Sequence, residues 1–370
     1  MAEQKVKAAK APKLADPIEA SVDIATQKMI IRSHELGVET IFDRAVNMKP
    51  CNIGLQGTCC KNCAMGPCRL PLPKAGIEGE DTRKGLCGAT ANTIAARNFS
   101  RMIAGGAAAH SDHGRAVAEV FHAAANKLTD DYKIKDPIKL LAIAPKYGVE
   151  IKVEVDGEMV DRDIDEVAVE LADVALAEWG KSEGNTLVPK HFPKARYELW
   201  KKLGVLPRSI DREIVEVMHR THIGVDQDYK NLMKQGARCA LADLSGSWLA
   251  TELQDVLFGT PSPLISEANL GVMKEDHVNV IVHGHEPILS EMIVAACQSA
   301  EMLELATKVG AKGIQLSGIC CTANEVLQRH GVPNAGNFLQ QELAIVTGAC
   351  DAMVVDVQCV FQNLANVAKC

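Results

Sequence analysis

Apolar residues recur at helical spacing along most of the first 260 positions. Between residues 26 and 45 they include Ile30, Leu36 and Ile41, which predicts one amphipathic helix despite Gly37 in its middle. The same spacing predicts further helices over 90–109, 114–128, 163–179, 210–218 and 243–257, with a short break at residues 111 and 112. The first part of the chain is therefore expected to be mainly helical.

A different pattern occupies residues 151–157. Three apolar residues between positions 151 and 155 alternate with charged ones, and Asp156-Gly157 follows directly. Alternation with a period of two is typical of a strand, and an Asp-Gly pair is typical of a two-residue hairpin turn. We expect a small β-hairpin within the helical part.

The pattern changes after Thr260-Pro261-Ser262-Pro263. Short apolar runs at 278–282, 313–317 and 353–357 alternate with helical stretches at 291–309 and 340–348. Strands that alternate with helices predict a parallel, Rossmann-like sheet. We therefore expect a disordered tail over 1–20, a mainly helical domain over 21–260, and an α/β domain over 261–370 that is incomplete at its carboxyl end.

Composition narrows the classes of function. The formal net charge of −7 is unfavourable for contacts with phosphate groups. Aromatic residues make up only 4% of the chain, which leaves few side chains for base stacking. A nucleic-acid partner is therefore not expected. The N-terminal residues mix Lys, Ala and Pro without the apolar stretch of a secretory signal, and no run is long enough for a membrane span. We expect a cytoplasmic protein without a membrane span.

Six of the 13 cysteines lie between Cys51 and Cys87. Because the cytosol keeps thiols reduced, clustered cysteines there are more often metal ligands than disulfides. Cys60 and Cys63 form a C-x2-C pair, and Cys68 and Cys87 complete a set of four. Four thiolates can hold a 4Fe-4S cluster or a structural zinc ion, and the spacing leaves both open.

Cys59 stands directly before Cys60. If the chain is extended there, the two side chains point to opposite sides, so Cys59 belongs to a second site. Its nearest companion is Cys51, and two ligands are half of what a second cluster needs. A twofold axis would supply the other half, which predicts a homodimer with a cluster on the axis. The alternative is that both are buried or free thiols.

Ligands of parallel sheets collect where the strands end. His285, Cys321 and Cys359 each follow a predicted strand, with Cys320 beside Cys321, so an imidazole and two thiolates can converge at one edge. This set predicts part of a metal site. Taken singly, the histidine could serve only as a loop hydrogen-bonding group, and each strand-end cysteine could belong to the core.

Two histidines, His110 and His113, are three residues apart and would share one face of a helical turn, where they could transfer protons near neutral pH. Asp112 between them and Asp243 farther along could each be no more than a helix cap. The remaining cysteines have no partner at ligand spacing and are interpreted as core or incidental thiols: Cys239, Cys297, Cys350 and Cys370.

Several runs occur together in a fixed order: CNIGLQGTCCKNCAMGPCRLP, GLCGATANTIAARN, AAAHSDHG, LFGTP, EANLGV, VHGHEP, GICCTANEVL and VVDVQC. From about Ile41 to the last residue, the chain thereby resembles the anaerobic nickel-iron-sulfur carbon monoxide dehydrogenases. Related hybrid-cluster proteins also combine helical and α/β parts, but the Cys59-Cys60 pair and its C-x2-C-x4-C continuation argue against them.

The resemblance implies an enzyme that interconverts CO plus water with CO2, two electrons and two protons at a Ni-Fe-S cluster. It implies a homodimer that shares one cluster through Cys51 and Cys59, with one 4Fe-4S cluster per subunit. The ligands implied for that 4Fe-4S cluster are Cys60, Cys63, Cys68 and Cys87. Ferredoxin or a similar carrier would accept the electrons, and acetyl-CoA synthase is a further possible partner.

The resemblance also implies roles at the active centre. His285, Cys321 and Cys359 would ligate the Ni-Fe-S cluster, with the second of the adjacent cysteines favoured as the ligand. His110 would be the acid-base histidine, His113 would lie on the proton path, and Asp243 would be a supporting carboxylate. Chains of this family continue into a second α/β domain with three more cysteine ligands and a catalytic lysine. The alternative is therefore a non-catalytic electron-transfer or dimerisation module.

Overall fold

The computed structural model describes residues 12–73 and 81–369, which divide into two compact units. One unit comprises residues 50–260, and the other combines residues 12–49 with 261–369. The division after residue 260 coincides with the predicted change of pattern. Residues 21–49 lie with the sheet, however, and not with the helical unit to which the sequence pattern assigned them.

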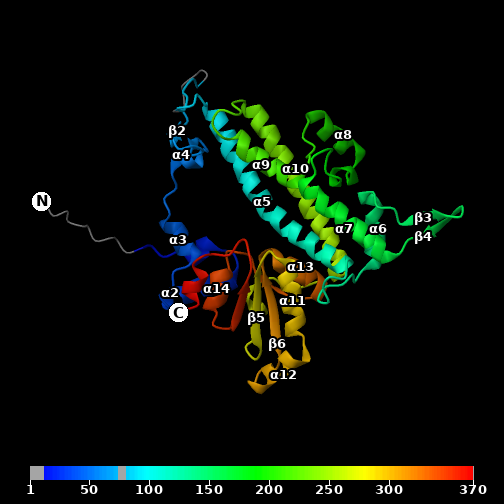
Figure 1. Cartoon of the computed structure of the whole chain (residues 1–370). Helices are drawn as coiled ribbons and strands as arrows, with labels where there is room; N and C mark the ends of the chain where they lie inside the picture. The colour runs from blue at the N-terminus through cyan, green and yellow to red at the C-terminus, as the bar shows by residue number, and fades with distance from the viewer. Residues whose placement is uncertain (1–11, 74–80, 370) are drawn as a thin grey trace. The chain divides into compact units, whose positions relative to one another are not determined.

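The unit formed by residues 50–260 is mainly helical, as expected. Its helices are α4 (Asn52–Leu55), α5 (Ala91–Ala125), α6 (Pro137–Ile143), α7 (Ile164–Gly180), α8 (Lys194–Leu203), α9 (Ile210–Arg220) and α10 (Tyr229–Phe258), with 3-10 turns at Ala144–Tyr147 and Val188–His191. Two short strands, β1 (Cys59–Cys60) and β2 (Cys68–Arg69), lie near its beginning. In Figure 1, α5 and α10 lie side by side over most of their lengths.

The two helices predicted over 90–109 and 114–128 are a single helix, so the expected break at residues 111 and 112 is wrong. Ser111 is buried inside α5 and donates its hydroxyl to Oδ1 of Asp211 at 2.6 Å. Its polar group is therefore satisfied by a neighbouring helix and does not compete with the backbone. Thr90 caps the start by accepting from the backbone N–H of Thr93.

Close approach of α5, α7 and α10 depends on glycine. A Cβ added to Gly114 of α5 would lie 3.0 Å from the indole ring of Trp179 in α7 and 3.3 Å from the carbonyl oxygen of Gly246 in α10. Trp179 also donates its indole N–H to the carbonyl oxygen of Ser111 at 3.0 Å. Three helices thus meet at one point where no side chain fits on α5.

A matched pair of glycine substitutions in α5 tests this packing. Gly114→Ala should destabilise the protein by about 1–3 kcal/mol, because the new methyl group displaces the indole or separates the helices. Gly105→Ala, in the same helix with nothing within 4 Å of the added Cβ, should instead stabilise it by about 0.5–1 kcal/mol. Urea unfolding of both variants measures the difference, and an equal effect would contradict the packing account.

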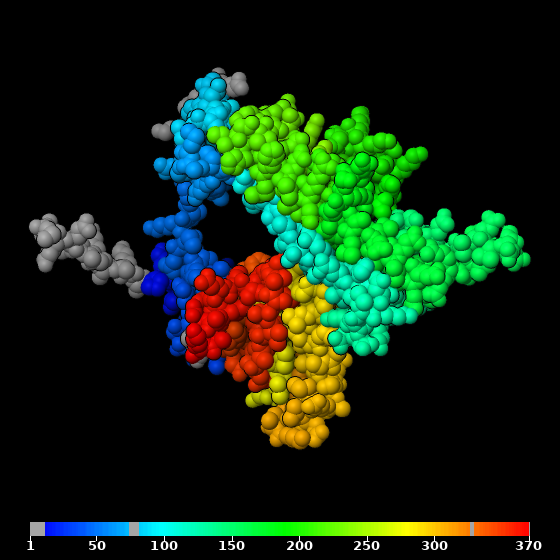
Figure 2. Space-filling view, in the orientation of Figure 1, coloured from blue at the N-terminus to red at the C-terminus, as the bar shows by residue number. Residues whose placement is uncertain are grey.

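The predicted hairpin is confirmed. Strands β3 (Lys152–Val155) and β4 (Glu158–Asp161) pair antiparallel, and Asp156 and Gly157 between them have φ angles of 54° and 84°. A type I′ turn requires both of its central residues to adopt the left-handed region, as these two do. All eight strand residues are exposed, and the hairpin projects from the helices of its own unit in Figure 2.

The other unit is built on a parallel sheet with strand order β7-β6-β5-β8. The strands are β5 (Val278–Gly284), β6 (Ile314–Ile319), β7 (Asn334–Gly336) and β8 (Ala352–Val355). The helices that accompany them are α11 (Pro287–Cys297), α12 (Ala300–Lys308), α13 (Cys320–His330), α14 (Gln341–Val346) and α15 (Leu364–Val367), with a 3-10 turn at Leu270–Val272. The prediction of a parallel sheet with intervening helices is confirmed.

Three details of this unit differ from the pattern. The helix predicted over 291–309 is two helices, because Ser299 begins a new one by accepting from the backbone N–H of Met302. Strand β7 was not predicted, since three residues are too few to show alternation. Helix α13 was not predicted either, and it begins directly at the end of β6.

The segment before residue 50 contains α1 (Pro17–Ala20), α2 (Ile24–Glu35) and α3 (Ile41–Asn47). The single helix predicted over 26–45 is therefore wrong: Gly37 adopts a φ of +68°, which ends α2, and Thr40 with Asp43 forms a capping box that begins α3. Residues 12–20 of the predicted tail include the buried Ala15 and helix α1, which begins at Pro17. Residues 1–11 of that tail lie outside the described residues.

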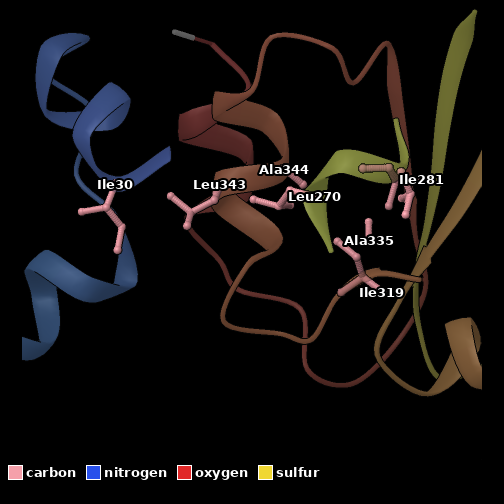
Figure 3. Packing of buried hydrophobic residues seen from close by; sticks show 8 residues of the cluster. Ile30, Leu270, Ile281, Ile319, Ala335, Leu343 and Ala344 are labelled. Atoms are coloured by element: carbon pink, nitrogen blue, oxygen red, sulfur yellow. The ribbon is translucent and has the colours of Figure 1, made fainter. Parts of the chain in front are cut away.

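Two apolar layers flank the sheet because its strands alternate. Ile281 and Ile319 face one layer, with Ile30 of α2 and Leu343 of α14, and α14 lies between α2 and the strands (Figure 3). Val282 and Leu316 face the opposite layer with Val294 of α11. The apolar face of α2 completes the first layer, which explains why residues 21–49 join the sheet.

An ion pair also joins the segment before residue 50 to the sheet unit. Arg44 of α3 donates to Oε1 of Glu342 at 2.7 Å, and Glu342 is fully buried at the start of α14.

Among residues 12–73 and 81–369, none of the helices is both long and apolar enough to cross a membrane.

Candidate metal centres

Strands β1 and β2 place two cysteines across from each other. Cys60 pairs with Cys68, and Cys59 pairs with Arg69. Cys60 is buried and lines a cavity, whereas the half-buried Cys59 does not. The backbone of β1 is extended, as the prediction of separate sites for Cys59 and Cys60 assumes. Successive side chains of a strand point to opposite sides, so the two thiols face apart.

The cavity brings together four of the predicted ligands. It is lined by Cys60, Cys63, Cys68 and Cys87 together with Asn62, Met65, Leu86, Arg97 and Ile223. The backbone N–H of Leu86 donates to the sulfur of Cys68 at 3.4 Å. A Cβ on Gly85 would lie 3.4 Å from the same sulfur, so a small residue lets the chain approach the thiol closely.

Positive charge faces these thiols. Arg97 is 2% exposed and donates through one terminal nitrogen to the sulfur of Cys87 at 3.7 Å. Burial raises the pKa of Cys87, but the backbone N–H of Ala89 and the Arg97 guanidinium outweigh burial and leave this pKa below its ordinary value. Nε of Arg97 and Nδ2 of Asn62 are buried donors without a hydrogen-bond acceptor in the protein.

This environment fits an iron-sulfur cluster. Thiolates of Fe-S proteins surround a multi-atom core, and hydrogen-bond donors to its sulfur atoms are part of the site. Four thiols around a cavity, with two unsatisfied buried donors in its lining, match that chemistry. Within the described ranges, no three His, Cys, Asp or Glu side chains are grouped in the way that a single metal ion needs.

Cys51 and Cys59 lie outside the lining of this cavity. Cys51 is exposed, and the backbone N–H groups of Gly54 and Ile53 lower the pKa of its thiol, with smaller contributions from Arg69 and Lys61. The loop of Cys59 is held to helix α5 by Asn98, whose amide donates to the carbonyl oxygen of Cys59 at 3.0 Å. An exposed thiol with a lowered pKa is available as a ligand.

The second candidate centre lies where β5, β6 and β8 end. His285 follows β5, Cys320 and Cys321 begin α13 directly after β6, and Cys359 follows β8 by four residues. Gly284 and Cys320 form a parallel bridge that extends the β5–β6 pairing to the cysteine. The strand ends therefore come together at one edge of the sheet, as expected from parallel topology.

The thiols at this edge influence one another. Burial, and then the neighbouring Cys359 and Cys321, raises the pKa of Cys320 to about 12. Burial and the same Cys359 also raise the pKa of Cys321. Close, buried thiols remain protonated unless a cation compensates their charge, and a coordinating metal deprotonates them.

Sequence reasoning missed Asp356, which organises this edge. Its carboxylate accepts from the backbone N–H of His285 at 2.7 Å, from that of Glu286 at 2.9 Å, and from that of Val357. A Cβ on Gly284 would lie 1.5 Å from Oδ1 of Asp356, so only glycine fits there. The signal in the sequence is an acidic residue that directly follows the apolar strand β8.

The two histidines and Asp243 lie in the helical unit. Nδ1 of His110 is 2.8 Å from Oδ1 of Asp243, whereas His113 is buried with Nε2 3.2 Å from the amide of Gln254. Asp112 and Asp243 both lie inside helices, so the alternative of helix caps is wrong for each. Helix α10 begins 14 residues before Asp243, where Asp228 is the cap.

The hydrogen bond that His110 donates to Asp243 raises the pKa of His110, against an opposing effect of burial. Replacement of Asp243 by Asn should therefore lower this pKa, because a neutral amide does not stabilise the imidazolium. NMR titration of the His110 ring measures the change. Asp112→Asn, an exposed charge two residues away on the same helix, is the control, and an equal shift in both variants would contradict a specific pair.

The raised pKa fixes the sign of a pH effect on stability. The pair stabilises the folded state fully below the ordinary His pKa of 6.5, and this contribution is lost as the pH rises through the higher folded-state value.

A four-thiol cavity in the helical unit, together with His and Cys at the edge of the parallel sheet, is typical of metalloproteins of the iron-sulfur class. A profile of the Prismane/CO dehydrogenase family matches residues 58–370, and the chain belongs to this family. Carbon monoxide dehydrogenase 1 of Methanosarcina acetivorans is 53% identical over 355 residues, and that of Carboxydothermus hydrogenoformans is 46% identical over 359; each alignment covers 95% of this chain.

Solved structures agree with the sequence matches. A nickel-free carbon monoxide dehydrogenase from Thermococcus sp. AM4 aligns over 97% of this chain with a TM-score of 0.89 and 48% identity. A chain of an acetyl-CoA synthase/carbon monoxide dehydrogenase, whose alpha subunits hold NiZn[Fe4S4] and NiNi[Fe4S4] clusters, aligns over 98% of this chain with a TM-score of 0.86 and 41% identity. The chain spans about half the length of these proteins: 54% of each of the two relatives, and 55% and 52% of the two structures.

Proposed function

We propose that this chain carries the iron-sulfur relay and part of the Ni-Fe-S centre of a carbon monoxide dehydrogenase, which interconverts CO plus water with CO2, two electrons and two protons. The observation that carries the proposal is the four-thiol cavity with its buried donors. The resemblance of the whole chain to carbon monoxide dehydrogenases supports it.

In this proposal, Cys60, Cys63, Cys68 and Cys87 hold a 4Fe-4S cluster. Cys51 and Cys59 supply two further thiolates, and a second copy of the chain supplies the matching two, so that a cluster lies on the axis of a homodimer. The exposure of Cys51 and its lowered pKa support a ligand that meets a partner.

His285, Cys321 and Cys359 are proposed as ligands of the Ni-Fe-S cluster, which would bind CO and activate water as a Lewis acid. Asp356 holds the backbone at His285 and orients that residue. Three ligands are fewer than such a cluster takes, so further ligands come from outside residues 1–370. Cys320 packs partly against the apolar layer beside α2 and α14, which favours its neighbour Cys321 as the ligand.

Proton transfer is assigned to the histidines of α5. Asp243 accepts from Nδ1 of His110 and orients the ring that would exchange the proton. His113, three residues farther along the helix, continues the path. Electrons would leave through the 4Fe-4S clusters to ferredoxin or a similar carrier in the cytoplasm, and acetyl-CoA synthase is a candidate partner because one structural relative is a complex with it.

Iron content distinguishes the proposed cluster sites. Cys63→Ser should remove about four iron atoms per chain and Cys59→Ser about two per chain, because the second cluster is shared between two chains. Cys350→Ser, a half-buried thiol bonded to the carbonyl oxygen of Ala352, should remove none. Iron analysis with sedimentation of the anaerobic protein measures this, and equal losses at Cys59 and Cys63 would contradict a shared cluster.

Activity separates the enzyme from a non-catalytic module. With nickel, and with the remaining half of a relative supplied, the chain should reduce viologen with CO. Cys321→Ala should lower this rate at least 100-fold while leaving the iron bound by the four-thiol cavity in place, because ligand loss disables the centre alone. Iron without nickel, together with no CO-dependent reduction, would leave only the electron-transfer or dimerisation module.

A further inference from the structure

Arg97 is a buried charge next to the four-thiol cavity. It lies on the second turn of α5 at 2% exposure and lines the cavity with the cysteines. One terminal nitrogen donates to the sulfur of Cys87 at 3.7 Å, and the other donates to the carbonyl oxygen of Asp226 at 3.4 Å. Nε has no acceptor in the protein.

Two other buried or half-buried arginines among the described residues have buried carboxylate partners. Arg208 pairs with the buried Glu213 at 2.8 Å, and Arg44 pairs with the buried Glu342 at 2.7 Å. Within the described residues, Arg97 forms no ion pair with a carboxylate. Because a buried charge is costly without a compensating charge, the thiolates of the cavity are the anions that match this guanidinium.

We infer that Arg97 is a positioning residue for the 4Fe-4S cluster held by the four thiolates, and that its charge sets the reduction potential of that cluster. The inference rests on the proposed function. A cluster gains one negative charge when it takes up one electron, so a fixed, buried positive charge stabilises the reduced state. Its unsatisfied Nε supplies a hydrogen-bond donor toward the cluster, and such donors tune the potential.

The experiment is an EPR-monitored redox titration of the anaerobic full chain in three forms. Arg97→Gln removes the charge but keeps donors, and should favour the oxidised state at least tenfold, which for a one-electron couple is a fall of about 59 mV. Arg97→Lys keeps the charge and should stay near the wild-type potential. Arg101→Gln is the control, one turn farther along α5, where the guanidinium bonds Thr221 and does not line the cavity.

Each outcome decides the inference. A lowered potential in Arg97→Gln alone supports it, as does loss of the cluster in Arg97→Gln with retention in Arg97→Lys. Unchanged potentials in both Arg97 variants overturn it, and so does loss of the cluster from both in a folded chain, because then the shape of arginine matters and not its charge. A wild-type chain that binds no iron-sulfur cluster would instead contradict the proposed function.

Discussion

The close packing of α5 against α7 and α10 is the constraint on which the helical unit depends. At Gly114 and Gly246 the helices approach so closely that an added methyl group on α5 would meet an indole ring. The contact lies within a single uninterrupted helix, α5, that runs from Ala91 to Ala125. Every polar group that α5 carries is therefore held at a set position relative to α10.

Helix α5 connects two kinds of chemistry along one rigid element. Its first turns carry Arg97 and Asn98, which hold Cys87 and the Cys59 loop. Its middle carries His110 and His113, about 20 Å and about 24 Å beyond Arg97 at a rise of 1.5 Å per residue. In the other unit, the edge of the parallel sheet brings the candidate ligands together. The carboxylate of Asp356 holds that edge by its contacts with the backbone of Gly284 and His285.

Much of this could be predicted from local pattern. The helical and parallel-sheet parts, the hairpin at Asp156-Gly157 and the change at residue 260 all followed from periodicity and turn residues. The convergence of Cys60, Cys63, Cys68 and Cys87 on one cavity followed from their spacing. The roles of these residues as ligands remain proposals.

Other features depend on tertiary contacts that no local pattern contains. The sequence pattern at Ser111 predicts a helix break, but in the structure the Ser111 hydroxyl donates a hydrogen bond to Asp211 and the helix continues. Residues 21–49 pack with the parallel sheet because Ile30 completes its apolar layer. They precede β5, the first strand of that sheet, by more than 200 positions. Arg97 and Asp356 are single polar residues whose importance shows only when their buried partners are known.

The most direct test of the central claim is the metal and acid-labile sulfide content of the wild-type chain after anaerobic purification, together with its Mössbauer spectrum. The account expects iron and sulfide in equal amounts, with at least about four of each per chain, in the spectrum of a 4Fe-4S cluster. One zinc ion per chain without sulfide would contradict it.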